Sequence, residues 1–146
     1  MQSPFLFVYG TLKSEAINTN AQYLHQHAQL LGRARWPGRL YLISNYPGAV
    51  PSSSNNEFVN GELWRLNDPD QLLATLDVYE ECAPSSPVPH EYKRSLESVQ
   101  LIAGEKGGAH IIQAWVYIYN LDIAGFNRID DGNFVNGNHK LIRRVL

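Results

Sequence analysis

Residues 68–80 carry the clearest helical pattern of the chain, because their hydrophobic positions recur at intervals of three and four. At about 100° per residue these positions fall on one arc of roughly 120°. The arc also includes the last residue of the stretch, and its members are Leu72, Leu73, Leu76, Tyr79 and Glu80. Asp68 suits the N-cap, Pro69 suits the first turn, and Gln71 falls where a capping box requires it. The pattern predicts a short helix that turns one carboxylate toward the core.

Glu80 is the unusual residue of this helix, since a carboxylate on a core-facing arc costs free energy unless it is paired, neutralised or used in chemistry. Two features predict a raised pKa for its carboxyl group: the hydrophobic arc, and a helix C-terminus whose dipole disfavours negative charge. Glu81 points about 100° further round, toward solvent. If the helix instead frays before Glu80, this side chain lies in a solvated loop. The pattern alone leaves both arrangements open.

Strands are predicted over much of the remaining chain from β-type runs of hydrophobic residues and from alternation. The expected segments are residues 5–9, 29–44, 58–66, 92–102 and 110–120. Residues 29–44 form either one long strand or two strands broken near Pro37 and Gly38. In residues 110–120 both alternating sets of side chains are hydrophobic, which indicates a central strand with two buried faces.

About five or six strands, two short helices and no regular β-α-β alternation predict an α+β fold. The second helix is expected at residues 20–28, with Asn20 as its N-cap. A closed or partly closed barrel explains strands that bury both faces. The 146 residues fit a single domain, residues 1–146, without an internal repeat or linker. Connections are expected at residues 45–56, 82–91, 104–108 and 130–140.

Composition excludes several classes of function. The net charge is −2, and the densest basic cluster is only Lys140, Arg143 and Arg144, so phosphate neutralisation and nucleic-acid binding have little support. The first hydrophobic run, Phe5 to Tyr9, is too short for a signal sequence or a membrane span and has no positive leader. We therefore expect a cytoplasmic protein that does not enter a membrane.

Cysteine and histidine usage argues against metal and redox chemistry. The single cysteine, Cys82, excludes an internal disulfide, and the five histidines are scattered without metal-ligand spacing. We therefore expect no metal and no other cofactor. Cys82 follows the two glutamates closely, but no adjacent histidine would activate it, so a nucleophilic role is not expected.

Three groups of residues, in this order along residues 5–120, resemble the gamma-glutamylcyclotransferase-like family. The first is Val8-Tyr9-Gly10-Thr11-Leu12-Lys13, directly after the first strand. The second is the middle stretch Gly38-Arg39-Leu40-Tyr41, Tyr46-Pro47-Gly48-Ala49-Val50 and Gly61-Glu62-Leu63-Trp64. The third is Leu76-Asp77-Val78-Tyr79-Glu80, followed after a loop by Tyr92-Lys93-Arg94. The Tyr-Gly-Thr-Leu turn alone is a weak signal, whereas the ordered combination is fairly specific.

The resemblance implies a small mixed β-barrel of about five to seven strands with flanking short helices and a pocket at its mouth. Active members, which include gamma-glutamylamine cyclotransferases, cleave a gamma-glutamyl bond intramolecularly and release 5-oxoproline with an amine or amino acid. The resemblance implies that Tyr9, Gly10, Thr11 and Leu12 line the gamma-glutamyl pocket and that Glu80 is the catalytic glutamate. Glu81 stands where the family commonly has glycine. Asp131-Gly132-Asn133 replaces the family's Ser-Gly-Asp, and no role is carried over to it.

This chemistry requires a deprotonated α-amine, a polarised γ-carbonyl and a proton for the leaving nitrogen. One carboxyl group, Glu80, can take the ammonium proton and return it to the leaving amine. Gly10 allows close approach of the backbone, whose N–H groups can hold the α-carboxylate or the oxyanion. Tyr117 either lines the pocket through its hydroxyl or is a core tyrosine. Taken without the resemblance, the turn is more simply one that ends a strand.

Other residues have alternatives of their own. Arg94 is expected to pair with Asp77 or with another carboxylate and so to fix local geometry. Glu62 either reaches the barrel interior or, more simply, lies on a solvated face. The loop 82–91 would form a rim that selects the leaving group. A non-enzymatic module that binds a small molecule in the same pocket is the main alternative function, and an RNA-binding barrel is disfavoured by the acidic balance. No pattern reveals the leaving amine or the oligomeric state.

Overall fold

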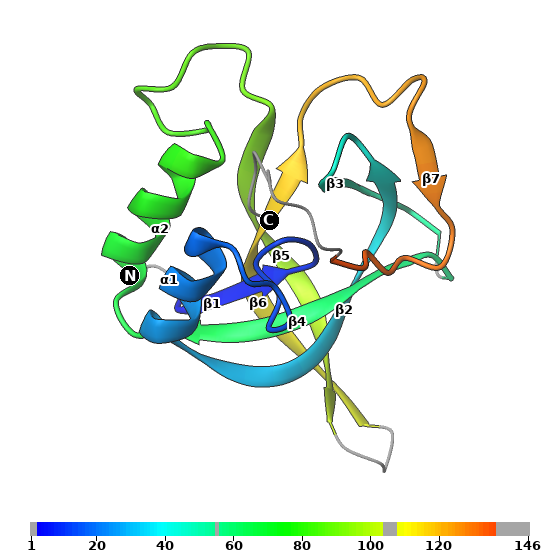
Figure 1. Cartoon of the computed structure of the whole chain (residues 1–146). Coiled ribbons are helices and arrows are strands. Elements are labelled where there is room, and N and C mark those ends of the chain that lie inside the picture. The colour runs from blue at the N-terminus through cyan, green and yellow to red at the C-terminus, as the bar shows by residue number, and fades with distance from the viewer. Residues whose placement is uncertain (1–2, 55, 104–107, 137–146) are drawn as a thin grey trace.

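A closed barrel forms the centre of the computed structural model, which describes residues 3–54, 56–103 and 108–136. Within those residues five strands close the barrel in the order β2-β4-β1-β6-β5, and β5 pairs again with β2 (Figure 1). Their bounds are β1 Phe5–Val8, β2 Ala28–Leu42, β4 Phe58–Leu66, β5 Tyr92–Ala103 and β6 Gly108–Tyr119. The β1–β6 pair is parallel and the other pairs are antiparallel, so the barrel is mixed, as predicted.

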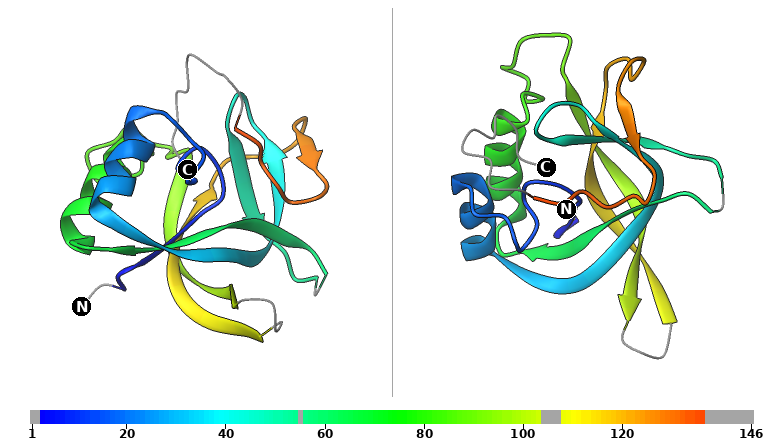
Figure 2. Two further views of the ribbon diagram at one scale, coloured as in Figure 1. Left: turned by 60° about the horizontal axis from the view of Figure 1, so that its bottom comes forward. Right: turned by 45° about the vertical axis from the view of Figure 1, so that its right-hand side comes forward.

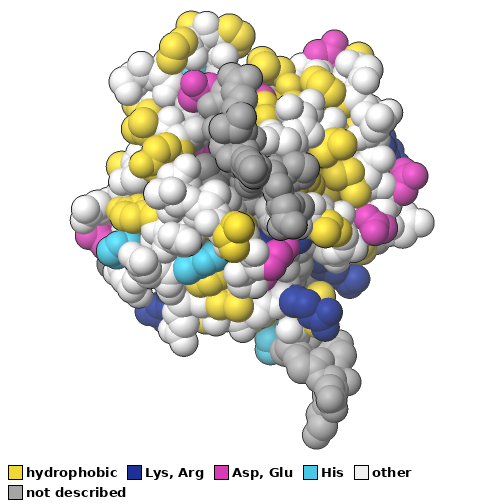
Figure 3. Space-filling model, viewed as in Figure 1, with side chains coloured by type: hydrophobic (Ala, Val, Ile, Leu, Met, Phe, Trp, Pro, Cys, Tyr) yellow, Lys and Arg dark blue, Asp and Glu magenta, His cyan; other side chains and the backbone are white. Residues whose placement is uncertain are grey.

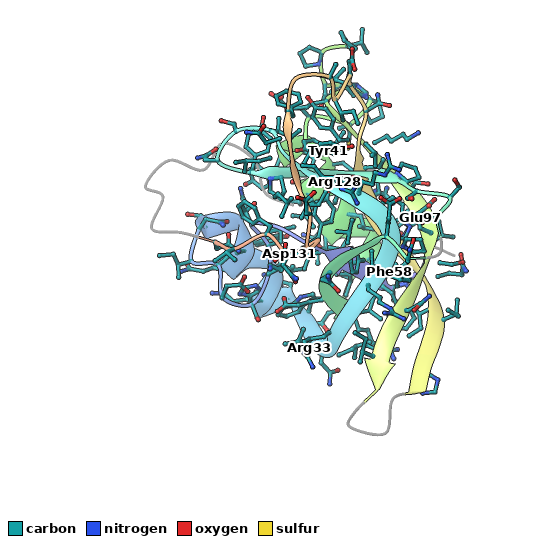
Figure 4. The ribbon with its side chains drawn as sticks, turned by 90° about the vertical axis from the view of Figure 1, so that its right-hand side faces the viewer. Arg33, Tyr41, Phe58, Glu97, Arg128 and Asp131 are labelled. Carbon is teal, nitrogen blue, oxygen red and sulfur yellow. The ribbon has the colours of Figure 1, made fainter. Side chains whose placement is uncertain are left out.

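β2 is one continuous strand, which settles the choice left open by Pro37 and Gly38. Its first part pairs with β4, and its last part pairs with two short strands, β3 Pro47–Pro51 and β7 Asn127–Ile129. A register shift between Leu30 and Gly32 marks a bulge, the kind of irregularity that lets a strand bend around a barrel. Figure 4 views this side, with Arg128 of β7 beside its register partner Tyr41 near the end of β2.

The prediction that β6 buries both faces is correct only for part of the strand. Residues Val116 to Tyr119 are all buried, but Ile111 is 62% exposed. The reason is that the first part of β6 pairs with β5 in a two-stranded ribbon that extends away from the barrel (Figures 1 and 2). The predicted turn at 104–108 falls largely on residues outside those described, as does the basic cluster at Lys140, Arg143 and Arg144.

Two helices, α1 Thr19–His27 and α2 Pro69–Tyr79, lie side by side against one flank of the barrel (Figures 1 and 2). The predicted N-cap of α1 is wrong by two residues: Asn18, not Asn20, caps the helix, and its Oδ1 accepts a hydrogen bond from Ala21 N at 2.8 Å. A tertiary bond favours this choice, because Asn18 Nδ2 also donates to the carbonyl of Thr11 at 2.6 Å. Neither described helix is long and apolar enough to span a membrane.

α2 matches its predicted position. Asp68 accepts a hydrogen bond from Gln71 N at 3.3 Å, and the three leucines of the arc, Leu72, Leu73 and Leu76, are buried. Tyr79 is the exception, since it is 44% exposed. It lies at the edge of the predicted arc and in the last turn, where the helix leaves the core.

A Schellman motif ends α2 immediately after Glu80. The N–H of Cys82 donates to the carbonyl of Asp77 at 3.0 Å, and the N–H of Glu81 donates to that of Val78 at 3.1 Å. Glu81 has a φ of 56° and therefore occupies the left-handed position of the motif. This explains in physical terms why glycine suits position 81, since a side chain with a Cβ is strained there.

We expect Glu81→Gly to stabilise the protein by about 1 kcal/mol, because glycine removes the left-handed strain. Urea denaturation measures the effect, with Glu81→Gln as the matched control that removes the charge and keeps the Cβ. A glycine variant no more stable than the glutamine variant would contradict the backbone explanation.

Candidate functional site

Glu80 is completely buried, with 0% of its surface exposed, at the C-cap of α2. Its own N–H donates to the carbonyl of Leu76 at 2.8 Å, so the backbone at Glu80 is still held by the helix. Of the two arrangements that the sequence left open, the solvated loop is therefore wrong. The helix and its Schellman motif fix the carboxylate inside the protein.

Three buried tyrosines, Tyr9, Tyr92 and Tyr117, interact electrostatically with Glu80. Burial is the main cause that raises the pKa of each phenol, and the negative charge of Glu80 raises each of these pKa values further. The structure thus brings together Tyr9, Tyr117 and Glu80, three residues that the sequence analysis selected. Tyr92, from the start of β5, was missed as a neighbour of the site, although it begins one of the family-like segments.

The single proton of each phenol is already used by a neighbouring group. Tyr9 donates to the carbonyl of Tyr117 at 2.5 Å, and Tyr92 donates to the carbonyl of Pro47 at 2.8 Å. Tyr117 donates to Asp77 Oδ1 at 2.7 Å. A phenol has one proton and two lone pairs, so none of these three hydroxyls has a further proton to donate. The Tyr9 hydroxyl also accepts a hydrogen bond from Ala49 N at 3.2 Å, which leaves it one lone pair.

Asp77, about one helical turn before Glu80, accepts hydrogen bonds from both Arg94 and Tyr117 and so forms the centre of a polar cluster. Arg94 Nε donates to Asp77 Oδ1 at 2.8 Å and Arg94 Nη2 donates to Oδ2 at 3.1 Å, which confirms the predicted pair. The Arg94 guanidinium also stacks over the ring of Trp115, 4.2 Å from its centroid. Tyr117 therefore holds a position set by an ion pair between α2 and β5.

Cys82 lies at the edge of this cluster. Burial, followed by the negative charges of Asp77 and Glu80, raises the pKa of its thiol to about 12. At neutral pH the group therefore remains a thiol, which is a poor nucleophile.

The predicted substrate-binding turn, Tyr9-Gly10-Thr11-Leu12, is buried along its whole length. Its carbonyls face side chains from other segments. Gly10 O accepts from Asn136 Nδ2 at 3.1 Å, and Leu12 O lies 2.9 Å from His25 Nε2. With the bond from Asn18 to Thr11, three successive carbonyls are held by side-chain nitrogens. Among the described residues, none accepts a hydrogen bond from the N–H of Leu12.

Glu62 supports the far end of the same turn from a half-exposed position at the surface, not from the barrel interior. Its carboxylate accepts hydrogen bonds from the N–H of Ser14 at 2.7 Å, from the Ser14 hydroxyl, and from Trp64 Nε1 at 3.2 Å. His25 stacks on Trp64 with ring centroids 4.8 Å apart and planes 9° apart. β4 and α1 thus hold the turn from two directions.

The segment that contains Asp131-Gly132-Asn133 runs from β4 to the turn. Asn60 N donates to the carbonyl of Gly132 at 2.8 Å, and further along Lys13 Nζ donates to the carbonyl of Phe134 at 2.6 Å. Phe134 is buried in the core. This segment, to which the sequence analysis gave no role, therefore packs directly beside the turn.

Two of the cavities in the described part of the chain are lined by residues outside the cluster around Glu80. One, of about 310 Å³, lies beside the turn and is lined in part by Lys13, Glu15 and Glu62. The other, of about 250 Å³, lies between β2, β4 and β7, on the side of the barrel away from α2 (Figures 1 and 4). There Glu57 accepts hydrogen bonds from Ser52, Arg39 and Arg128, which lower its pKa to about 2.

The loop between α2 and β5, residues 82–91, forms the top of the molecule in Figure 1. In the space-filling view of the same face, hydrophobic side chains gather there (Figure 3), and Val88 is 81% exposed. At the end of the loop, Glu91 accepts a hydrogen bond from the hydroxyl of Tyr46 at 2.6 Å.

Among the described residues no three His, Cys, Asp or Glu side chains are grouped to hold a metal ion.

Comparison with known proteins places this arrangement in a family. The family model described as "Gamma-glutamyl cyclotransferase, AIG2-like" matches residues 6–136. The gamma-glutamylcyclotransferase family protein YtfP of Escherichia coli K12 is 32% identical over 132 residues, which cover 90% of this chain and 96% of that protein. The gamma-glutamylaminecyclotransferase of Mus musculus is 28% identical over 124 residues, which cover 77% of this chain and 75% of that protein.

The fold agrees with these matches. The crystal structure of an AIG2-like protein from Mus musculus superimposes with a TM-score of 0.68 at 26% identity, covering 100% of this chain and 97% of that one. The family match extends over the whole region that carries the turn, the middle segments and Glu80. The chain therefore belongs to the gamma-glutamyl cyclotransferase, AIG2-like family.

Proposed function

We propose that the protein is a gamma-glutamyl cyclotransferase in which Glu80 is the general acid and base. The α-amine nitrogen of a small gamma-glutamyl substrate attacks its own γ-carbonyl carbon and forms the five-membered ring of 5-oxoproline. The bond from this carbon to the leaving nitrogen then breaks. Glu80 takes one proton from the α-ammonium group and gives it to the leaving nitrogen, so the enzyme returns to its starting state. The second proton that the attacking nitrogen loses on ring closure passes to the released amine, which leaves as an ammonium ion.

The observation that carries this proposal is the complete burial of Glu80, whose charge acts on the phenols of Tyr9, Tyr92 and Tyr117. Burying a carboxylate costs free energy, so its position at this point of the fold favours a role in chemistry. The hydroxyls of Tyr9, Tyr92 and Tyr117 offer lone pairs, which suit a substrate ammonium group. Binding the amine beside both Glu80 and these oxygens orients it for ring closure, and orientation supplies much of the acceleration in an intramolecular reaction.

The turn would bind the other polar part of the gamma-glutamyl group. The N–H of Leu12 is buried, and a buried backbone donor is rarely left without an acceptor. A substrate carboxylate or the oxyanion at the γ-carbon would supply that acceptor. Tyr9, Gly10, Thr11 and Leu12 are therefore the proposed substrate-binding residues, with Tyr117 beside them.

The test is the release of 5-oxoproline from a panel of gamma-glutamyl amino acids, gamma-glutamyl amines, gamma-glutamyl-ε-lysine and glutathione. The mouse relative is named for gamma-glutamylamines, so these substrates are measured first. We expect release from at least one class, and its amine product identifies the leaving group. If folded protein released no 5-oxoproline from any compound of the panel, this result would contradict the enzymatic proposal. It would favour a module that binds such a ligand without turnover.

A further inference from the structure

The carbonyls of the turn are fixed by the start of the chain's first helix. Asn18, the N-cap of α1, uses both ends of its amide: Oδ1 accepts from Ala21 N at 2.8 Å and Nδ2 donates to Thr11 O at 2.6 Å. About two turns later in α1, His25 Nε2 lies 2.9 Å from Leu12 O. Since a carbonyl can only accept, Nε2 of His25 carries a proton in this contact.

Holding a carbonyl also fixes the neighbouring amide. A peptide unit is planar and trans, so the carbonyl of one residue and the N–H of the next point in opposite directions. The bond from Asn18 to Thr11 O therefore sets the direction of the Leu12 N–H. Likewise, the bond from Asn136 to Gly10 O sets the direction of the Thr11 N–H.

We infer that Asn18 is a positioning residue for substrate binding, which aims the Leu12 N–H at the substrate while capping α1. The inference rests on the proposed function. The Asn18 side chain then has two functions that substitutions can separate. Its Oδ1 accepts a hydrogen bond and stabilises the helix, and its Nδ2 donates one and fixes the turn. His25 supports the same turn at the following carbonyl.

The two tasks can be separated by substitution. Asn18→Asp keeps an oxygen for Ala21 N, so the cap is retained, but it removes the donor to Thr11. Asn18→Ser also retains a capping oxygen and adds no charge. Asn20→Asp is the matched control, because it places the same charge in the first turn of α1 and leaves Asn18 in place.

We expect Asn18→Asp and Asn18→Ser to lower kcat/KM about tenfold, the effect of one lost hydrogen bond, while the melting temperature stays near that of the wild type. Asn20→Asp should keep wild-type activity. An increase in KM alone would assign the Leu12 amide to the substrate carboxylate, and a decrease in kcat would assign it to the oxyanion; either result supports positioning. Normal kinetics in both Asn18 variants would overturn the inference.

Amide hydrogen exchange of Leu12, measured by NMR, provides a test that needs no turnover. Faster exchange in both Asn18 variants than in wild type and Asn20→Asp supports a turn held by Asn18, and unchanged exchange overturns it. If the wild type releases no 5-oxoproline, the proposed function fails, and titration with 5-oxoproline as the probe decides the inference. A change in the chemical shift of the Leu12 amide on addition of 5-oxoproline to the wild type, smaller in the Asn18 variants, supports positioning. If the wild type shows no such change, the inference is overturned.

Discussion

Glu80→Gln is expected to lower kcat for 5-oxoproline release by at least about a hundredfold, the usual contribution of a general acid or base. The amide of glutamine has nearly the shape of the carboxyl group but cannot accept and return a proton at neutral pH. Glutamine also fills nearly the same buried volume at the end of α2, so the folded state should be about as stable as that of the wild type.

Glu81→Gln is the matched control, because it makes the same chemical change at the exposed next residue. It should leave kcat within about twofold of the wild type, since an exposed group does not reach the reacting atoms. Steady-state kinetics on the best substrate of the panel, with circular dichroism to verify folding, measure both variants. A Glu80→Gln enzyme that keeps most of its rate would show that another group transfers the proton.

α2 and its buried glutamate could be predicted because both depend on local sequence. The periodicity of the leucines and the cap at Asp68 are features within about one dozen residues, and the structure has them where expected. The pair of Asp77 with Arg94 was also predicted, since two opposite charges lay in neighbouring family-like segments. Burial of Glu80 was one of the two arrangements that its place on the hydrophobic arc left open, and the continuation of the helix to Glu80 decides between them.

The supports of the turn could not be predicted, because they connect distant parts of the chain. Glu62 binds Ser14 across 48 positions, and Asn136 binds Gly10 across 126. The N-cap of α1 illustrates the same limit. Asparagine occurs at both 18 and 20, so local capping preference does not distinguish them, and the choice is visible only once Thr11 lies beside Asn18.

The left-handed residue after Glu80 was identified only by its departure from the family pattern. Position 81 holds a glutamate where the resemblance implies glycine, and a glutamate does not by itself signal a left-handed backbone. The φ of 56° at this residue supplies the missing reason. The side chain is tolerated because Glu81 is exposed, so its cost is limited to backbone strain.

The largest expected effect on stability is that of Asp77→Ala, which should cost about 3–5 kcal/mol. The two side chains of the ion pair are only 18% exposed for Arg94 and 15% for Asp77, so water cannot replace the carboxylate effectively. Removing it leaves the guanidinium of Arg94 and the hydroxyl of Tyr117 without the acceptor that both use. Urea denaturation of the folded chain measures the loss.

Two further variants identify the cause of that loss. Asp77→Asn should cost less than Asp77→Ala, because the amide oxygen still accepts from Tyr117. The double variant Asp77→Ala with Arg94→Met should be less destabilised than the sum of its single variants, since methionine removes the charge that had bound Asp77 and keeps much of the contact with Trp115. If Asp77→Ala lowered the free energy of unfolding by less than about 1 kcal/mol, this result would contradict a buried ion pair. An ion pair that contributes so little behaves as a solvated surface pair and cannot hold Tyr117 in place.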